Sequence, residues 1–242
     1  MMPDCPRTRR LGLPAGSRRH PCPAPPSSLM IHIRLCECER SLHPRNTYVK
    51  TYLKYSEGAA GGRCSGKESC HGRHEKRMRL MVEKMLPRHW PQLRAVYLEG
   101  VETGHATFET EAPGWARWDA AHLPFARLVA LDGERVAGWA ALGRVSAREV
   151  YAGVAEVSVY VGREFRGAGA GRSLLAALVE ASEQNGVWTL QASVFPENAA
   201  SMALHRACGF REVGRRERIG RLRGRWRDTI LLERRSRLVG AD

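Results

Sequence analysis

The sequence predicts an α/β fold over residues 78–236, built of alternating strands and helices. Strand-like and helix-like hydrophobic patterns alternate along this part of the chain. One apolar strand pattern runs through the glycine-rich residues 166–171 directly into an amphipathic helix. A later helix pattern starts at Asn198, a residue type that caps helices, and stops at Gly209. These features indicate one domain of alternating strands and helices.

The individual elements are expected from periodicity and from the turn residues at their ends. The first helix has Leu93, Val96 and Tyr97 on one side, three to four residues apart. Asp132-Gly133-Glu134, between two apolar segments, predicts a hairpin. Asn185-Gly186 ends the helix after the glycine-rich residues. In chain order the sequence predicts a strand at 81–85, helices at 87–102 and near 115–123, strands at 126–131, 136–142 and 154–161, a helix at 173–184, a strand at 188–194, a helix at 198–208, and strands at 211–219 and 226–232.

The strand, glycine-rich turn and helix over residues 154–179 carry the strongest functional signal. Such a turn places unpaired backbone N–H groups at the positive end of a helix dipole, which suits the phosphates of a nucleotide, a dinucleotide or coenzyme A. No Lys-Ser or Lys-Thr pair follows the glycines, so the P-loop pattern is absent. The dinucleotide pattern also fails, because Arg172 stands three residues after Gly169. What remains is Arg-x-x-Gly-x-Gly, from Arg166 to Gly171.

Arg-x-x-Gly-x-Gly resembles the pyrophosphate loop of the GNAT N-acetyltransferase family, whose members bind acetyl-CoA. The helix from Asn198 to Phe210 is similar to that family's Asn-to-Gly-Phe helix, with His205 where many members carry tyrosine. The phosphinothricin acetyltransferase-like branch of this family has a glutamate just before the corresponding strand and also carries this histidine. This sequence resembles that branch, because Glu156 stands just before Val157-Ser158-Val159-Tyr160-Val161. The resemblance implies an acyl-CoA N-acyltransferase fold, in which a mixed central sheet is flanked by helices and is splayed where the cofactor enters.

The resemblance also implies residues that hold acetyl-CoA, and no metal. The backbone of Val159 and Val161 would bind the pantetheine arm as an added strand would, and Asn198 would reach the same arm. Glycines in the loop let phosphate oxygens approach the backbone. Arg172 would contact the 3′-phosphate side, with a solvated surface arginine as the alternative. The backbone positions expected at the pyrophosphate are Arg166, Gly167, Ala168, Gly169, Ala170 and Gly171.

Two residues are the catalytic candidates for direct attack of an amine on the thioester. Glu156 interrupts an apolar strand and is the candidate base, with a solvent-facing glutamate as the alternative. His205, near a helix end, is the candidate acid for the departing thiolate, with a structural histidine as the alternative. Cys208 is interpreted as a packed structural thiol and not as a nucleophile.

The acceptor site is expected, from the resemblance, at four residues. Arg148 and Tyr151 would face the acceptor's anionic groups, because an arginine fork suits a carboxylate or phosphinate. Phe108 and Trp115 would line the pocket. Ser146 and Glu109 depart from the branch, which often has lysine and arginine there. The acceptors that fit are phosphinothricin, its arsenic analogue, methionine sulfone or sulfoximine, or a related α-amino acid, and herbicide or antibiotic resistance would follow.

Residues 1–77 differ from the rest of the chain. They carry 15 Lys/Arg against 6 Asp/Glu, which is +9 of the formal +14, and six of the seven cysteines. We interpret them as a disordered extension or an over-called translation start, with 237–242 as a short tail. Cys64, Cys70, His71 and His74 miss the usual zinc-ligand spacing. No membrane segment is expected, and the protein is predicted to be cytoplasmic.

Three hypotheses follow. The first is acetylation of a small amino-acid-like acceptor, by a homodimer as the resemblance implies. The second is acetylation of a protein or peptide N-terminus, which requires an open groove. The third, of another class, is a non-enzymatic nucleic-acid binder that uses the basic front segment and the arginines at 215–227. Because those arginines alternate with apolar and acidic residues, we interpret them as solvated faces of a hairpin and expect no nucleic-acid partner.

Overall fold

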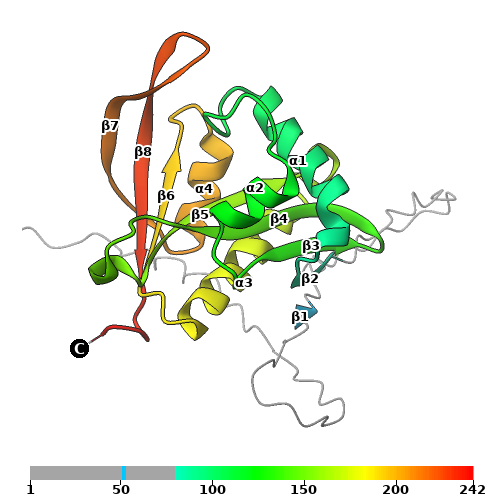
Figure 1. Cartoon of the computed structure of the whole chain (residues 1–242), viewed down its shortest axis with the longest axis horizontal. Coiled ribbons are helices and arrows are strands. Elements are labelled where there is room, and N and C mark those ends of the chain that lie inside the picture. The colour runs from blue at the N-terminus through cyan, green and yellow to red at the C-terminus, as the bar shows by residue number, and fades with distance from the viewer. Residues whose placement is uncertain (1–50, 53–79, 242) are drawn as a thin grey trace, which may run out of the picture. The chain divides into compact units, whose positions relative to one another are not determined.

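The structure, a computed structural model of the chain, describes residues 51–52 and 80–241. Its centre is a mixed sheet of eight strands in the order β1-β2-β3-β4-β5-β6-β8-β7 (Figure 1). All neighbouring strands are antiparallel except β5 and β6. The strands are β1 Thr51–Tyr52, β2 Leu80–Lys84, β3 Leu128–Asp132, β4 Arg135–Arg144, β5 Val154–Val161, β6 Thr189–Val194, β7 Arg211–Leu222 and β8 Arg225–Arg235.

Four α-helices and three short 3-10 turns complete the described part. The α-helices are α1 Trp90–Glu102, α2 Trp115–Ala121, α3 Ala170–Gln184 and α4 Ala199–Ala207, and the 3-10 turns are η1 Pro87–His89, η2 Glu149–Tyr151 and η3 Arg163–Phe165. None of the helices in the described residues is long and apolar enough to cross a membrane. The alternating order of strands and helices expected from the sequence is confirmed.

Two hydrophobic cores lie on opposite faces of the sheet. One packs the apolar side of α3, including Leu174 and Leu178, and Met202 of α4 against β5, β6 and β8. The other packs α1 and α2 against β3 and β4, with Trp118 and Trp139 at its centre. Both tryptophans are almost fully buried. The sheet therefore carries two helices on each face.

Some boundaries differ from the sequence-based expectation. The helix predicted to begin at Ser173 begins at Ala170, because Gly169, with φ 85°, takes the left-handed conformation and ends the loop. The final hairpin was expected to turn over residues 220–224, but its strands are longer. Only Arg223 and Gly224 separate them, both with positive φ, as a two-residue hairpin turn requires.

The front segment contributes one element that the sequence did not indicate. Thr51–Tyr52 forms the two-residue strand β1, which pairs with β2. Without it, β2 would be the edge strand of the sheet, and an edge offers unpaired N–H and C=O groups to any nearby chain. The other expectations for residues 1–79, including the cysteine and histidine cluster, lie outside the described residues.

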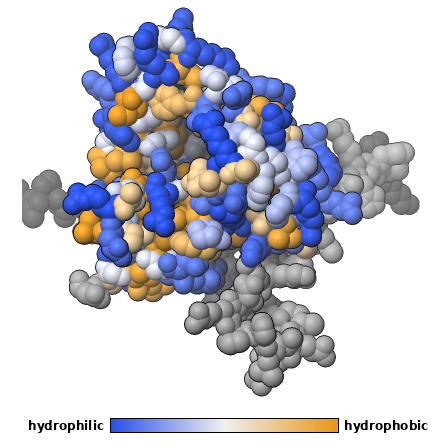
Figure 2. All heavy atoms as spheres, viewed as in Figure 1, coloured by the Kyte–Doolittle hydropathy of each residue, from blue (hydrophilic) through white to orange (hydrophobic). Residues whose placement is uncertain are grey.

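The β7–β8 hairpin projects beyond the rest of the sheet (Figure 1). Hydrophilic residues dominate its projecting end at the upper left of Figure 2, with a few hydrophobic ones among them. Exposed apolar residues on these strands include Val213, Ile219 and Trp226. Most of the hairpin arginines are exposed, as expected, but Arg227 is not, with only 20% of its side chain accessible.

Candidate active site

The sheet opens between β5 and β6. These parallel strands pair at only three positions, the last of which joins Glu156 to Gln191. Beyond this point residues 157–161 of β5 remain paired with β4 but not with β6. Because the two strands part here, β5 presents five residues of backbone at an open wedge. This is the splayed sheet that the resemblance implied.

The backbone groups of Val159 and Val161 lie on the open side of β5. Gly162 N donates to Ala137 O of β4 at 2.9 Å, and a Cβ built on Gly138 would lie 2.5 Å from the Tyr160 carbonyl oxygen. Residues 160 and 162 therefore direct their backbone polar groups toward β4. Since successive residues of a strand alternate, residues 159 and 161 direct theirs toward β6.

The glycine-rich loop lies at the far end of the same stretch of β5. Gly167 and Gly169 have φ of 76° and 85°, and nothing lies within 4 Å of a Cβ built on either. The first hydrogen bond of α3 runs from Ser173 N to Gly169 O, so the N–H groups of residues 170–172 have no intrahelical partner. Arg166 adds a guanidinium, whose Nε donates to Val161 O at 3.4 Å. An open loop with bare N–H groups suits a pyrophosphate.

Glu156 occupies the point where the wedge begins. Its neighbours Ala155 and Val157 are buried against α3, so alternation places Glu156 on the α1–α2 face, where its side chain is exposed. Within the described residues no hydrogen bond or ion pair reaches its carboxylate. An exposed, unpartnered carboxylate is able to accept a proton from an incoming amine.

His205 of α4 is buried, with 2% of its surface accessible. Its Nδ1 lies 2.8 Å from Ser201 O, so in the neutral ring Nδ1–H donates to that carbonyl. Nε2 is buried and has no partner among the described residues. From its position near a helix end, we expected His205 to exchange protons near neutral pH. In the structure, burial lowers the pKa of His205, so the neutral form prevails at pH 7.

Asn198 has two partners within the protein. Its Oδ1 accepts from Ser201 N at 3.1 Å, which confirms the predicted cap of α4. Its Nδ2 donates to His105 O at 3.2 Å, in the loop after α1. The amide expected at the pantetheine arm therefore also joins α4 to the loop after α1.

Arg172 and Cys208 lie near each other on the α3–α4 side. Arg172 is exposed in the first turn of α3. Burial raises the pKa of the Cys208 thiol, and the charges of Arg172 and Arg234 oppose this in part. A raised pKa keeps the thiol protonated, which agrees with a structural role and not with a nucleophile.

The four expected acceptor residues fall into three separate groups. The Arg148 guanidinium lies 5.6 Å from the Tyr151 ring centre, on the β4–β5 connection, and both side chains are exposed. Phe108 packs against Phe195, with 4.8 Å between ring centres. Trp115 instead packs against Trp90 and Trp118 on the α1–α2 face. In the described chain no hydrogen bond, ion pair or ring contact joins the three groups.

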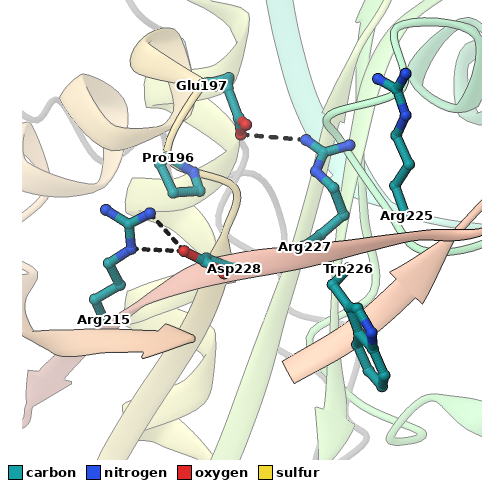
Figure 3. Close-up of a pocket in the computed structure, with 7 residues that line it drawn as sticks. All are labelled: Pro196, Glu197, Arg215, Arg225, Trp226, Arg227 and Asp228. Carbon is teal, nitrogen blue, oxygen red and sulfur yellow. Dashed lines mark hydrogen bonds and ion pairs between the residues drawn. The ribbon is translucent and has the colours of Figure 1, made fainter. Parts of the chain in front are cut away.

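One cavity of about 620 Å³ lies between the β7–β8 hairpin and the connection from β6 to α4. Figure 3 shows Arg225 and Arg227 on one side of β8 and Trp226 on the other. The cavity is polar, and its lining consists of Pro196, Glu197, Arg215, Arg225, Trp226, Arg227 and Asp228. It does not include Glu156, the glycine-rich loop or any other predicted site residue.

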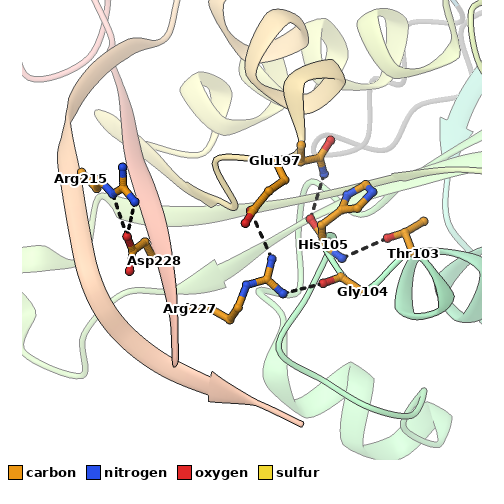
Figure 4. A network of polar contacts seen from close by, with 8 residues as sticks. Thr103, Gly104, His105, Glu197, Arg215, Arg227 and Asp228 are labelled. Atoms are coloured by element: carbon orange, nitrogen blue, oxygen red, sulfur yellow. Dashed lines mark hydrogen bonds and ion pairs between the residues drawn. The ribbon is translucent and has the colours of Figure 1, made fainter. Parts of the chain in front are cut away.

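Sequence reasoning missed the polar contacts beside this cavity. Arg227 binds both Glu197 and the carbonyl oxygen of Gly104, at 3.2 and 3.0 Å (Figure 4). Nothing in the sequence distinguishes Arg227 from the other arginines of the hairpin, because its partners lie 30 and 123 residues away. Within the described residues no group of three or more His, Cys, Asp or Glu side chains could hold a metal ion.

Comparison with known proteins agrees with this geometry. The sequence profile described as "Acetyltransferase (GNAT) family" matches residues 87–210. The phosphinothricin N-acetyltransferase of Alcaligenes faecalis is 37% identical over 153 residues, which are 60% of this chain and 76% of that protein. The L-methionine sulfoximine/L-methionine sulfone acetyltransferase of Pseudomonas paraeruginosa is 38% identical over 107 residues, which cover 44% of this chain and 62% of that protein.

Solved structures show the same fold. A phosphinothricin acetyltransferase from Sinorhizobium meliloti, solved in complex with acetyl-CoA, is 29% identical with a TM-score of 0.61, over 67% of this chain and 91% of that one. A ribosomal-protein-alanine N-acetyltransferase from Brucella melitensis is 32% identical with a TM-score of 0.59, over 64% of this chain and 99% of that one. With its open wedge, its glycine-rich loop and its matching profile, this chain belongs to the GNAT acetyltransferase family.

Proposed function

We propose that this protein transfers the acetyl group of acetyl-CoA to the amine of a small amino-acid-like acceptor, by direct attack and without an acyl-enzyme. One observation carries the proposal. Residues 157–161 form a stretch of β5 that does not pair with β6 and is about 17 Å long, at roughly 3.3 Å per residue, with Glu156 at one end and the glycine-rich loop at the other. A cofactor arm lying along this stretch would place its phosphates at the loop and its thioester near Glu156.

Each residue then has a role in a balanced reaction. Glu156 accepts a proton from the acceptor's ammonium, and the free amine attacks the thioester carbonyl. The C–N bond forms, the nitrogen of the tetrahedral intermediate loses its second proton to solvent, and the intermediate collapses as the C–S bond breaks to leave the CoA thiolate. His205 would return a proton to this thiolate from Nε2, because Nδ1–H is held by Ser201 O. Since burial lowers the pKa of His205, its protonated form is a minority species at neutral pH, but it is a stronger acid than an exposed imidazolium.

The cofactor contacts complete the proposal. Backbone groups of Val159 and Val161 bind the pantetheine arm, and the N–H groups around Gly169 bind the pyrophosphate. Arg166 and Arg172 add positive charge beside these phosphates. Asn198 would bind the arm while it keeps α4 capped.

The acceptor class rests on Arg148 and on the relatives' names. Arg148 is exposed beside Tyr151, and its planar fork matches a carboxylate or phosphinate. The proteins from Alcaligenes faecalis and Sinorhizobium meliloti are named for phosphinothricin, and the one from Pseudomonas paraeruginosa for methionine sulfoximine and sulfone. Because Phe108 and Trp115 lie apart from Arg148 in one chain, we also propose a homodimer whose second copy completes the acceptor pocket. Sedimentation equilibrium tests this assembly.

A thiol-release assay tests the function directly. The full chain is incubated with acetyl-CoA and a panel of phosphinothricin, methionine sulfone, methionine sulfoximine and ordinary α-amino acids. We expect turnover of at least one acceptor that carries both an α-amine and an anionic or strongly polar side chain, with N-acetylation confirmed by mass spectrometry. Absence of turnover across the panel would overturn the proposal of a small acceptor.

Acetylation of a protein N-terminus is the second candidate. It is favoured by the match to the Brucella melitensis protein, which is named for ribosomal-protein alanine. The same assay with short peptides that begin with alanine separates the two. A kcat/KM for a peptide at least tenfold above that for every free amino acid would support this candidate over the first.

A further inference from the structure

Arg227 of β8 lies where three segments meet. Its Nη1 donates to Gly104 O at 3.0 Å, in the loop after α1. Its Nη2 donates to a carboxylate oxygen of Glu197 at 3.2 Å, in the connection from β6 to α4. The same guanidinium lies 4.4 Å from the ring centre of Phe195, at the end of β6. Figure 4 shows the polar contacts converging on this one side chain.

The environment of Arg227 differs from that of an ordinary surface arginine. Only 20% of its side chain is exposed, whereas 60% of the Glu197 side chain is exposed. The pKa of Glu197 is lowered by its own backbone N–H and also by the hydrogen bond from Arg227. A half-buried guanidinium that stacks on an aromatic ring and donates in two directions is held in one geometry.

The loop that Arg227 contacts is attached to α4 by few other interactions. Among the described contacts of residues 103–108, these are the hydrogen bond from Asn198 Nδ2 to His105 O and the contact of Phe108 with Phe195, in the connection that leads from β6 to α4. Elsewhere the loop is held to α1 and β5, because the Thr107 side chain hydrogen-bonds with Tyr97 and Tyr160. Phe108 also lies against Gly220 of β7, where an added Cβ would be 2.7 Å from its ring. Two of the residues concerned, Asn198 and Phe108, belong to the proposed cofactor and acceptor sites.

The helix α4 has further anchors that do not involve Arg227. Leu204 approaches Gly171, where an added Cβ would be 3.1 Å from the Leu204 side chain, and Met202 lies in the core under α3. The His205 ring packs edge-on against Phe210. Loss of Arg227 would therefore release the loop over residues 103–108 more than it would move α4.

We propose that Arg227 is a positioning residue that holds the loop of residues 103–108, with Phe108, on the N-terminal end of α4. It shapes the acceptor side of the site without touching the reacting atoms. This proposal rests on the proposed function, because it presumes that Phe108 meets the acceptor and that Asn198 meets acetyl-CoA. We therefore expect loss of Arg227 to weaken binding of the acceptor more than binding of acetyl-CoA, and we call this difference the asymmetry.

Steady-state kinetics test the asymmetry on the full chain. For Arg227→Ala we expect the acceptor KM to rise at least tenfold, while the KM for acetyl-CoA changes less than threefold. Arg227→Lys keeps the charge but not the two-way fork, so it should recover only part of the loss. Arg225→Ala is the matched control, because Arg225 is exposed two residues away on the same side of β8 and has no polar partner in the described structure (Figure 3).

A double-mutant cycle separates positioning from general destabilisation. If Arg227 acts through the loop, its loss should have a smaller effect in a Phe108→Ala background, so the two substitutions would not be additive. Additive losses, or an unchanged acceptor KM in Arg227→Ala, would overturn the proposal. A loss that disappears when rates are normalised to folded protein would overturn it as well.

Hydrogen exchange gives a readout that needs no acceptor. Arg227→Ala should raise amide exchange in peptides that cover residues 103–109 but leave residues 200–207 of α4 near the wild-type rate. Arg225→Ala should change neither. Equal protection of the loop in Arg227→Ala and the wild type would refute the positioning role. Wild-type inactivity on every acceptor, with faster loop exchange in Arg227→Ala, would count against the proposed function only.

Discussion

At the scale of single residues, the proposal of a catalytic site at the open wedge depends most on Glu156. It stands where β5 and β6 stop pairing, and its carboxylate is exposed and has no partner in the described structure. Sequence alone left open whether it was a base or an ordinary solvent-facing glutamate. The parting of the strands beside it favours the base, because only there would a thioester come within reach.

Glu156→Gln is predicted to lower kcat by about 10²- to 10⁴-fold, the usual contribution of a general base. The amide keeps the size and polarity of the side chain but does not accept the proton at neutral pH. Binding of acetyl-CoA, measured by calorimetry, should be unchanged, because in the proposed arrangement the phosphates and the arm would bind backbone groups and not the Glu156 side chain. Glu180→Gln, on the exposed side of α3, serves as the control. A kcat within twofold of wild type would remove Glu156 from the mechanism.

At the scale of elements, the start of α3 combines a backbone requirement with a binding role. Gly169→Ala is predicted to cost roughly 1 kcal/mol of unfolding free energy, because φ of 85° is unfavourable for a residue with a Cβ. It should also raise the KM for acetyl-CoA, because the new methyl group would project toward the phosphates. Chemical denaturation and steady-state kinetics measure the two effects.

Gly186→Ala is the matched control for the glycine prediction. Gly186 has φ of 77° and open space around a Cβ, but it lies after the C-terminal end of α3, away from the loop. It should show the same loss of stability without the rise in KM. A similar rise in KM for both variants would contradict a direct role for Gly169 in phosphate binding.

The C-terminal end of α2 depends on Arg127. Its guanidinium donates to the carbonyl oxygens of Asp119, His122 and Leu123 at 2.6 to 2.9 Å, and it forms an ion pair with the Asp119 carboxylate. Only 17% of its side chain is exposed. The arginine therefore donates to carbonyl groups at and just beyond the helix end, where intrahelical donors run out.

Arg127→Ala is predicted to lower the unfolding free energy by about 2–4 kcal/mol, because several partly buried acceptors lose a charged donor at once. Arg127→Lys should recover little of this, since one ammonium does not reproduce the planar fork. Urea denaturation measures the change. Arg144→Ala, at an exposed arginine at the end of β4, should change stability by less than about 0.5 kcal/mol. Equal effects of the two alanine variants would contradict the capping role.

At the scale of the whole molecule, we expect three histidines that lose solvent on folding to make stability depend on pH. Burial lowers the pKa of His89, His122 and His205 below the ordinary value of 6.5. Between the folded and unfolded pKa values, the unfolded chain binds protons that the folded chain does not. Lowering the pH therefore favours unfolding, so the stabilisation is present above about pH 6.5 and is lost as the pH falls below it.

The predicted measurement is a fall in unfolding free energy between pH 7.5 and pH 5.5, a range in which histidines titrate before most carboxylates. Replacing His122 and His205 by glutamine should flatten this slope, whatever it does to stability at pH 7.5. Thr229→Val, a change at a buried residue that does not titrate, should leave the slope unaltered. A steeper or unchanged slope in the histidine variants would show that other groups cause the pH dependence.

The sequence determined the local features of this protein. The order of strands and helices, the cap at Asn198, the glycine-rich turn and the hairpin at residues 132–134 follow from periodicity and from residue types that act over a few positions. The sequence patterns did not predict the early start of α3, which depends on the left-handed conformation of Gly169. They did not predict β1 either, because this strand forms only by pairing with β2. Family resemblance singled out Glu156 as the candidate base and His205 as the candidate acid, and periodicity alone does not supply these roles.

The tertiary structure alone decided what surrounds these residues. It separated β6 from β5 after Glu156, buried His205 so that its pKa falls, and brought Arg227 to Gly104 across 123 residues of chain. Burial and long-range contacts depend on how elements pack, and neighbouring residues along the chain carry no record of that packing. The sequence therefore indicated the candidate residues of this site, and the packing of β5, α4 and β8 decided how those residues lie.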